Sequence, residues 1–539
     1  ILSHRSFAAG NEGMIYTEYT AEITKIFKGL AQSPKLMTIT VEGGVVGNEA
    51  VRVMPDVKFS QGETGIFFLQ LHTKNGDFTG YEPYAWEQCI VRYDDNGRVG
   101  DIFKTYTHIP VLYSSIARLL GNSYRSIQPL ILPSARLNTK LKAKGEKTLA
   151  AAITNFTPTT ITAGTYSVLT INGSGFGASY TGAAKVDFRN SDDGGASFIS
   201  AAASQIVSWT DNQIQVRVPE ASGTGVIRVT GVDGSQATSG GTVTVDFAVF
   251  NVTDQNNAIQ QTYLPNVNGT GGYTLTFNTN FSTNTDAVSA FKRALKSWRC
   301  GTFVNYGLAT GTTNVNCNNG TDGVNVVAFD DNCTLATGVL GVTYSYWSGC
   351  NTTYWRLREM DYIFKASAPA GGWNFGPGAT TGNKYDFQSV CLHELGHGHQ
   401  LGHIIANGKV MHYALGANTD VRTLNTVSDI GGGNDVVARS ITTKPCGPGV
   451  MTKLTAGTCD VGIAPTAAFI GSPLQGCVPL TVNFTDQSTD SPTSWEWDFK
   501  NDGSATSTVQ NPSYTYTTPG TYSVKLTASN ASGTSPLTR

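Results

Sequence analysis

The sequence predicts a multidomain protein in which several all-β, sandwich-like modules flank one α+β domain. Its 539 residues suffice for about three to five domains, each with its own core. Short alternating segments separated by glycine-containing turns fill most of the chain, and they are typical of β domains. The stretch 393–403 differs, because it and the residues up to 412 hold five of the eight histidines. Such clustering indicates a metal site.

Composition bears on the partners and the compartment. The net charge is −2 and 14% of residues are charged, so we expect no binding to nucleic acid or to an anionic membrane surface. No apolar run approaches the ~18 residues of a membrane span. We expect a secreted or cell-surface protein whose signal peptide has been removed, with disulfides among its nine cysteines. Their pairing cannot be deduced from spacing, and the odd number leaves at least one thiol over.

Residues 1–113 predict an N-terminal β domain, because short alternating segments are separated by turns. A hairpin turn explains Asp94-Asp95-Asn96-Gly97 better than a Ca²⁺ site does, so no motif supports calcium. Residues 114–152 turn helical and then basic. The basic positions are Arg136, Lys140, Lys142, Lys144 and Lys147. This run is either a solvated linker or a processing site that would free the rest of the chain from a prodomain.

Residues 153–250 predict a sandwich of short strands. The segments 153–158, 169–177 and 209–211 resemble the immunoglobulin-like TIG module. Residues 464–539 resemble the PKD domain, through Trp495-Glu496-Trp497-Asp498-Phe499 and the turns that follow it. Both resemblances imply all-β modules that act as spacers or bind extracellular protein or glycan surfaces.

The histidine stretch has the spacing of a catalytic metal site. On a helix, His393 and His397 share one face and can bind one ion, with Glu394 beside an open coordination position. His403 completes the set only if the helix ends near residue 400, whereas His399 lies on the opposite side and is interpreted as structural. In such a site the ion lowers the pKa of its bound water, and the carboxylate takes the water's proton and hands it to the leaving amine.

This three-histidine signature, followed by Val410-Met411-His412-Tyr413, resembles the metzincin zinc metalloproteases. The resemblance implies an α+β catalytic domain over residues 251–463. It implies Zn²⁺ bound by three ligands: His393, His397 and His403. Met411 would form the apolar floor beneath the metal. The Met-His-Tyr turn resembles the astacins, so Tyr413 is either an oxyanion stabiliser or part of the pocket wall.

Gln400 departs from the metzincin pattern, which has glycine there. If His403 is a ligand, we expect a positive φ at Gln400 or at Gly402, and Gln400→Gly should then stabilise the domain by up to about 1 kcal/mol. In the rival geometry the helix continues through Gln400, and the same substitution destabilises it by about 1 kcal/mol.

The order of elements in this domain resembles the matrixin branch of the metzincins. We expect a strand at 273–278, a helix behind Asp286, strands at 324–329, 339–347 and 354–364, and then the metal helix. The resemblance makes Val339 to Trp347 the edge strand beside the cleft, where an extended peptide substrate could add to the sheet. Matrixin precursors place a cysteine on the metal, and Cys89 is a candidate, although residues 87–90 lack the switch motif.

The sequence therefore predicts a secreted zinc endopeptidase of extracellular proteins, with Glu394 and Tyr413 as catalytic candidates. The alternative is an adhesin or another surface-binding modular protein in which the metzincin domain is inactive. Gln400 favours this alternative, and the intact Glu394 opposes it.

Overall fold

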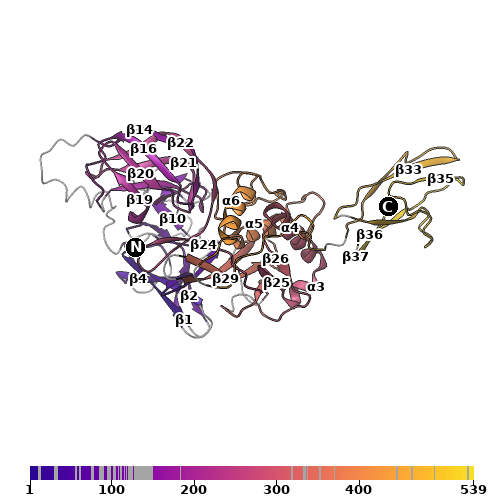
Figure 1. The fold of residues 1–539 in the computed structure, drawn as a ribbon, viewed down its shortest axis with the longest axis horizontal. Helices are drawn as coiled ribbons and strands as arrows, with labels where there is room; N and C mark the ends of the chain where they lie inside the picture. The colour runs from indigo at the N-terminus through magenta and orange to yellow at the C-terminus, as the bar shows by residue number, and fades with distance from the viewer. Residues whose placement is uncertain are drawn as a thin grey trace.

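The structure, a computed structural model, describes residues 150–539 apart from gaps at 182–183, 317–319, 332–334, 337, 351–353, 369–370, 445–446, 463–464, 491 and 531–532. Before residue 150 it describes 1–9, 14–28, 34–54, 57–59, 62–74, 78–83, 90–93, 99–100 and a few positions between 105 and 126. Cys89, the turn at 94–97 and the basic run lie outside the described residues. Figure 1 shows a multidomain, mostly β molecule whose C-terminal sandwich stands apart at one end.

The first sandwich has two facing sheets. One sheet contains β14 (Ala152–Thr157), β16 (Val168–Ser174), β20 (Gln213–Arg217) and β19 (Ile206–Trp209). The other contains β15 (Thr160–Ala163), β22 (Gln236–Ala248), β21 (Ser222–Thr230), β17 (Lys185–Asn190) and β18 (Phe198–Ser200). A short 3-10 helix, η2 (Ala203–Gln205), precedes β19. Alternate residues of the strands, such as Leu169 and Ile171 of β16, are fully buried between the sheets, as the period of two requires.

The C-terminal sandwich is built in the same way. Its first sheet contains β32 (Phe469–Ser472), β33 (Leu480–Asp486) and β35 (Ser513–Tyr516), and its second contains β34 (Ser494–Asp498), β36 (Lys525–Asn530) and β37 (Gly533–Thr538). The indole of Trp497 is fully buried at the centre of its core, against Phe469 and Phe484.

The middle domain is a sheet covered by helices on one face. The sheet contains β26 (Tyr306–Leu308), β25 (Tyr273–Phe277), β27 (Asn325–Phe329), β29 (Tyr354–Phe364) and β28 (Gly341–Cys350), of which β28 runs antiparallel to β29. Short strands accompany it: β23 (Asn251–Thr253), β24 (Ile259–Tyr263), β30 (Trp373–Asn374) and β31 (Tyr385–Asp386). The helices are α3 (Thr279–Thr283), α4 (Thr285–Thr302), α5 (Phe387–Gly398) and α6 (Asp429–Ser440). The predicted order of a strand, a helix, further strands and then the helix that carries His393 and His397 is confirmed.

The N-terminal region forms further sheets. One contains β1 (Ser3–Ala9), β2 (Met14–Glu22), β4 (Leu36–Glu42), β9 (Phe78–Pro83) and β8 (Leu69–Lys74). A second contains β12 (Thr105–Tyr106), β11 (Val99–Gly100), β10 (Ile90–Tyr93) and β7 (Gly65–Phe67), and β13 (Arg125–Ser126) pairs with β3 (Lys25–Ile26). Two more strands of this part of the sequence, β5 (Gly44–Val46) and β6 (Glu49–Met54), do not join these sheets. They extend the sheet of the middle domain instead.

The prediction that residues 339–347 form a free edge strand is wrong. β6 pairs antiparallel with β28, with Met54 opposite Thr343 and Glu49 opposite Ser348, so β28 is an internal strand. Val51 and Val53 pack on one face of the sheet with Tyr344 and other residues, while Ala50 and Met54 join the core under the helices. The sequence could not reveal this, because strand pairing between segments far apart depends on tertiary contacts.

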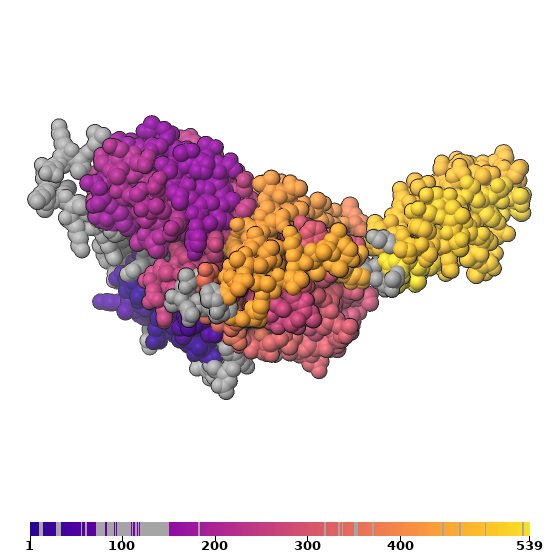
Figure 2. Space-filling model, in the orientation of Figure 1, coloured from indigo at the N-terminus to yellow at the C-terminus, as the bar shows by residue number. Residues whose placement is uncertain are grey.

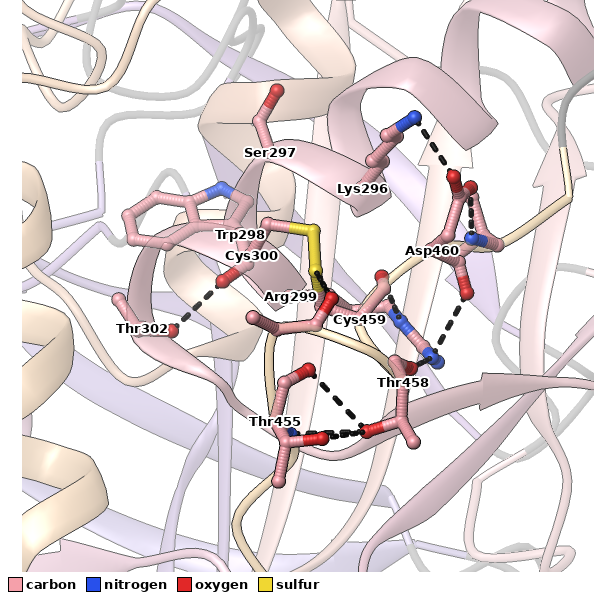
Figure 3. Close-up of a disulfide and its surroundings, with 12 residues drawn as sticks. Lys296, Ser297, Trp298, Arg299, Cys300, Thr302, Thr455, Thr458, Cys459 and Asp460 are labelled. Atoms are coloured by element: carbon pink, nitrogen blue, oxygen red, sulfur yellow. Dashed lines mark hydrogen bonds and ion pairs between the residues drawn. A yellow bond between two sulfur atoms is a disulfide. The ribbon is translucent and has the colours of Figure 1, made fainter. Parts of the chain in front are cut away.

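A disulfide closes the middle domain. Cys300 in α4 bonds to Cys459, 159 residues later, which confirms the expectation of disulfides (Figure 3). The guanidinium of Arg299 donates to the carbonyls of Thr458 and Cys459 beside it. By restricting the unfolded chain, such a bond stabilises a domain by about 2–4 kcal/mol. Among the described residues, Cys391 is a buried free thiol and Cys477 an exposed one.

Candidate metal centre

A buried ion pair fixes the start of α5, the helix that carries His393 and His397. Asp386 is the N-cap residue, and its carboxylate accepts a hydrogen bond from the backbone N–H of Ser389 at 2.9 Å. Arg422 pairs with the same carboxylate, which is fully buried. The helix therefore begins at Phe387, and it presents His393 and His397 one turn apart.

The helix ends where the third histidine requires. α5 stops at Gly398, and Gln400 adopts a φ of +69°, which confirms the expected left-handed residue. The chain then pairs with the end of the first sandwich, because the N–H of Gly402 donates to the carbonyl of Ala248 at 2.9 Å. This turn brings His403 back toward the helix. The rival geometry, with a helix running through Gln400, is wrong.

The three histidines meet through their Nε2 atoms. Nε2 of His393 lies 3.0 Å from that of His397 and 3.3 Å from that of His403. Each Nδ1 donates a hydrogen bond to an oxygen atom. Nδ1 of His393 donates to the carbonyl of Val410 at 2.7 Å, and Nδ1 of His397 donates to the carbonyl of Leu401 at 2.9 Å. Nδ1 of His403 donates to the carboxylate of Asp192 at 2.9 Å. These bonds leave each Nε2 with its lone pair directed at the other two.

This donor set fits a zinc ion. In a tetrahedral site with Zn–N distances of about 2.0–2.1 Å, the nitrogens lie about 3.3 Å apart, close to the spacings here. The three ligand atoms all lie within 4.8 Å of one another. Burial lowers the pKa of His393 to about 3, and the neighbouring His403 adds to this effect. Burial also lowers the pKa of His397, with a further contribution from His393. Both imidazoles are therefore neutral at pH 7, as metal ligands must be.

Glu394 lies beside the histidines and against β28. Its side chain is 4% exposed, and Oε2 accepts a hydrogen bond from the hydroxyl of Thr343 at 2.7 Å. Burial raises the pKa of Glu394 to about 8, although the bond from Thr343 acts in the opposite direction. A carboxylate that titrates near neutral pH can both take and return a proton.

Met411 packs beneath the helix. The side chain is buried, and a Cβ on Gly396 would lie 2.2 Å from its sulfur, so this position of the helix must be glycine for the two to fit. Gly396 directly precedes His397. The role of Met411 as a floor beneath a metal stays a prediction.

Tyr413 and His399 each pack against residues outside the set of three histidines. The ring of Tyr413 packs against Gly194 of the first sandwich, and its role, as an oxyanion stabiliser or as part of the pocket wall, stays a prediction. His399 is fully buried, and its Nε2 bonds to the hydroxyl of Thr302 at 2.9 Å. His399 is thus a core residue, as its position on the helix predicts.

No local pattern in the sequence predicts the residues that contact these histidines from other parts of the chain. Asp192 comes from the first sandwich, more than two hundred residues before the ligand that it contacts. The ring of Phe250 stacks on His397 with centroids 5.8 Å apart, and the guanidinium of Arg52 lies 4.5 Å from the centroid of Phe250. Arg52 is in turn paired with Glu220 of the same sandwich. No local pattern links these residues to a metal site.

Two segments of the chain match known families. The IPT/TIG domain model matches residues 151–247, and the PKD domain model matches residues 463–538. Neither segment includes the histidines, so these matches carry no support for a metzincin domain. No curated protein matches the chain. Among the described residues, no helix combines the length and apolarity needed to cross a membrane.

Solved structures resemble single parts of the chain. The PKD1 domain of Vibrio anguillarum Epp is 34% identical over 14% of this chain and 88% of its own, with a TM-score of 0.12. The PKD1 domain of the Vibrio cholerae metalloprotease PrtV is 33% identical over 14% of this chain and 93% of its own, with a TM-score of 0.12. An auxiliary nutrient binding protein from Bacteroides thetaiotaomicron is 16% identical over 19% of this chain, with a TM-score of 0.15. This chain spans 22% of that protein's length.

Proposed function

We propose that this chain, whose residues 151–247 are a TIG domain and residues 463–538 a PKD domain, is an extracellular endopeptidase whose middle domain depends on zinc. One observation carries the proposal. Three buried or half-buried imidazoles direct Nε2 at a common point, while each Nδ1 is held by an oxygen atom. Unliganded histidines gain nothing from facing one another, whereas a bound cation would stabilise this arrangement.

The neighbouring residues provide the rest of a hydrolytic site. Bound zinc would supply Lewis acidity toward water and toward a peptide carbonyl. Glu394 would take a proton from the attacking water and return it to the leaving amine, and the hydroxyl of Thr343 would hold its carboxylate in place. Met411 would support the helix beneath the metal. Tyr413 remains a candidate for contact with the oxyanion.

Substrate cannot be expected to pair with β28, because β6 already does so. His393 and Tyr413 are partly exposed, whereas His397 and His403 are buried. A peptide would therefore approach from the side of His393 and Tyr413, between the middle domain and the TIG domain. Figure 2 shows these two domains side by side.

The proposal is tested by metal content and by proteolysis of the full chain. Purified protein should contain one zinc and hydrolyse casein, and a chelator should abolish hydrolysis until zinc is restored. Glu394→Gln should keep the zinc and lose nearly all turnover, because the ligands remain while proton transfer is lost. Glu359→Gln, at another buried carboxylate of the same domain, is the matched control and should retain turnover. A chain that hydrolyses casein without metal would contradict the proposal.

A second candidate function is supported more directly by the comparisons. Two segments of the chain match the TIG and PKD domain models, and β6 pairs with β28, the strand that was expected to bind the substrate. We propose as the alternative a surface adhesin or a modular protein that binds protein or glycan, with an inactive middle domain. This alternative would be favoured if the zinc-loaded chain left casein and peptide libraries intact. The wild type and Glu394→Gln should then bind an extracellular protein or a glycan array equally well.

A further inference from the structure

A loop of the TIG domain reaches the metal centre. The loop joins β17 to β18 and carries Asp192, whose carboxylate lies 2.9 Å from Nδ1 of His403. Hydrogen bonds within the loop hold it in shape: the N–H of Asp192 donates to the side chain of Asn190 at 3.1 Å, and the N–H of Gly195 to the carbonyl of Asn190 at 2.7 Å. The N–H of Ser197 donates to the carboxylate of Asp193 at 3.0 Å. These hydrogen bonds within the loop therefore fix the position of Asp192.

The same loop fits closely against the segment after His403. Gly194 has a φ of +68°, and a Cβ there would lie 2.4 Å from Cζ of Tyr413. Only glycine leaves room for this approach. The position of Asp192 relative to His403 is therefore set by packing between the two domains.

The three histidines differ in what holds Nδ1. His393 and His397 donate to backbone carbonyls of their own domain, those of Val410 and Leu401. His403 donates to a carboxylate of another domain. A carboxylate acceptor orients the imidazole and makes its other nitrogen a stronger ligand.

We propose that Asp192 is a positioning residue of the metal centre, through which the TIG domain sets the zinc affinity of the middle domain. The inference rests on the proposed function only in taking zinc as the ion of the site. It assigns the TIG domain a role beyond that of a spacer, because undocking this domain would remove the partner of His403. Residues that orient a metal ligand in this way change affinity by roughly 10–100-fold.

Zinc affinity of the full chain tests the proposal without any need for turnover. Competition against a chromophoric chelator would compare the wild type with Asp192→Ala and Asp192→Asn, and Co²⁺ absorption would report on the ligand geometry. Asp192→Ala should weaken zinc roughly 10–100-fold and alter the Co²⁺ spectrum. Asp192→Asn keeps an oxygen acceptor without the charge and should weaken zinc less. Asp211→Ala is the control, since Asp211 accepts a hydrogen bond from the N–H of Gly177 within the same domain.

The outcomes separate this proposal from the function itself. If Asp192→Ala binds zinc as tightly as the wild type with an unchanged Co²⁺ spectrum, the proposal is overturned, even where the variant melts at a lower temperature, because Asp192 then only docks the domains. If the wild type binds no zinc, the proposed function fails instead. Should Asp192→Ala not fold, Asp192→Asn, which preserves the shape of the side chain, decides the matter by the same readouts.

Discussion

The indole N–H of Trp347 donates a hydrogen bond to the side-chain oxygen of Gln400 at 2.7 Å, and both side chains are buried. The amide nitrogen of Gln400 donates to the carbonyl of Gly398 at 3.1 Å. Gln400 thus satisfies two buried groups while holding a φ of +69°. These bonds explain why a residue other than glycine stands at the turn into His403.

Gln400→Gly should destabilise the middle domain by about 1–2 kcal/mol, contrary to the stabilisation expected from backbone conformation alone. Glycine relieves roughly 1–2 kcal/mol of strain, part of which its greater unfolded-state entropy cancels. Against this, the substitution leaves the indole N–H of Trp347 buried without a partner, which costs about 1–3 kcal/mol, and it opens a cavity. Denaturant unfolding of the two full chains measures the difference.

Trp347→Phe provides the control for this prediction. With phenylalanine at 347 there is no N–H to leave unpaired, so Gln400→Gly should then be close to neutral or stabilising. Equal effects of Gln400→Gly in both backgrounds would show that the bond from Trp347 does not hold the turn.

His403→Ala and His399→Ala should have opposite effects on zinc and stability. His399 packs against Trp298 with ring centroids 5.3 Å apart and bonds to Thr302, so its removal should cost about 2–4 kcal/mol while zinc affinity is kept. His403→Ala should lose zinc affinity at least a hundredfold, since one of three ligands is gone. Zinc titration and thermal melting measure both. Unchanged zinc affinity in His403→Ala would mean that another residue is the third ligand.

β6 should behave as a permanent strand of the middle domain. Ala50, Val51, Val53 and Met54 are each at most 5% exposed, so displacing the strand would expose two cores. Amide hydrogen exchange of β6 should therefore be as slow as that of β29, and much slower than that of the outer strand β1. Adding a peptide substrate to the Glu394→Gln variant should not speed the amide exchange of β6. Faster exchange of β6 on adding the peptide would identify it as a displaceable plug over β28.

Glu359 should make the middle domain less stable as the pH rises. Burial raises the pKa of Glu359 from 4.5 to about 7, although hydrogen bonds from the N–H groups of Gly323 and Asp322 act in the opposite direction. The folded state thus binds the proton more tightly than the unfolded state does. Its stabilising contribution is complete below about pH 4.5 and is lost as the pH rises through about 7.

Glu359→Gln should remove this dependence, because glutamine is neutral at every pH. As the pH rises from 4.5 to 8, the free energy of unfolding of the variant should increase by on the order of 3 kcal/mol relative to that of the wild type. Denaturant unfolding at a series of pH values measures this difference. Glu496→Gln in the PKD domain replaces an exposed carboxylate and should show no such gain. Parallel pH profiles of Glu359→Gln and the wild type would contradict the assignment.

Local patterns predicted much of the molecule. The predicted strand 354–364 coincides with β29, and the predicted helix behind Asp286 lies within α4. In α4 the buried residues recur at helical spacing, and the side chain of the N-cap residue Asn284 accepts a hydrogen bond from the N–H of Ala287. The TIG and PKD domains were found through their sequence motifs and are confirmed by the family models. The prediction of an edge strand was wrong because the partner of β28, β6, lies about three hundred residues away in the sequence. The periodicity of a strand does not show which distant strand pairs with it.

The sequence by itself determined that His393, Glu394 and His397 share a helix, and that His403 can join them only if the helix ends near Gln400. Helical spacing and backbone sterics are local, so they act wherever this stretch is placed. Only the tertiary structure decided that Asp192 of the TIG domain holds His403, that Trp347 holds Gln400, and that β6 closes the sheet. Each is a hydrogen bond or strand pairing between distant segments, and their geometry arises when the domains pack against one another.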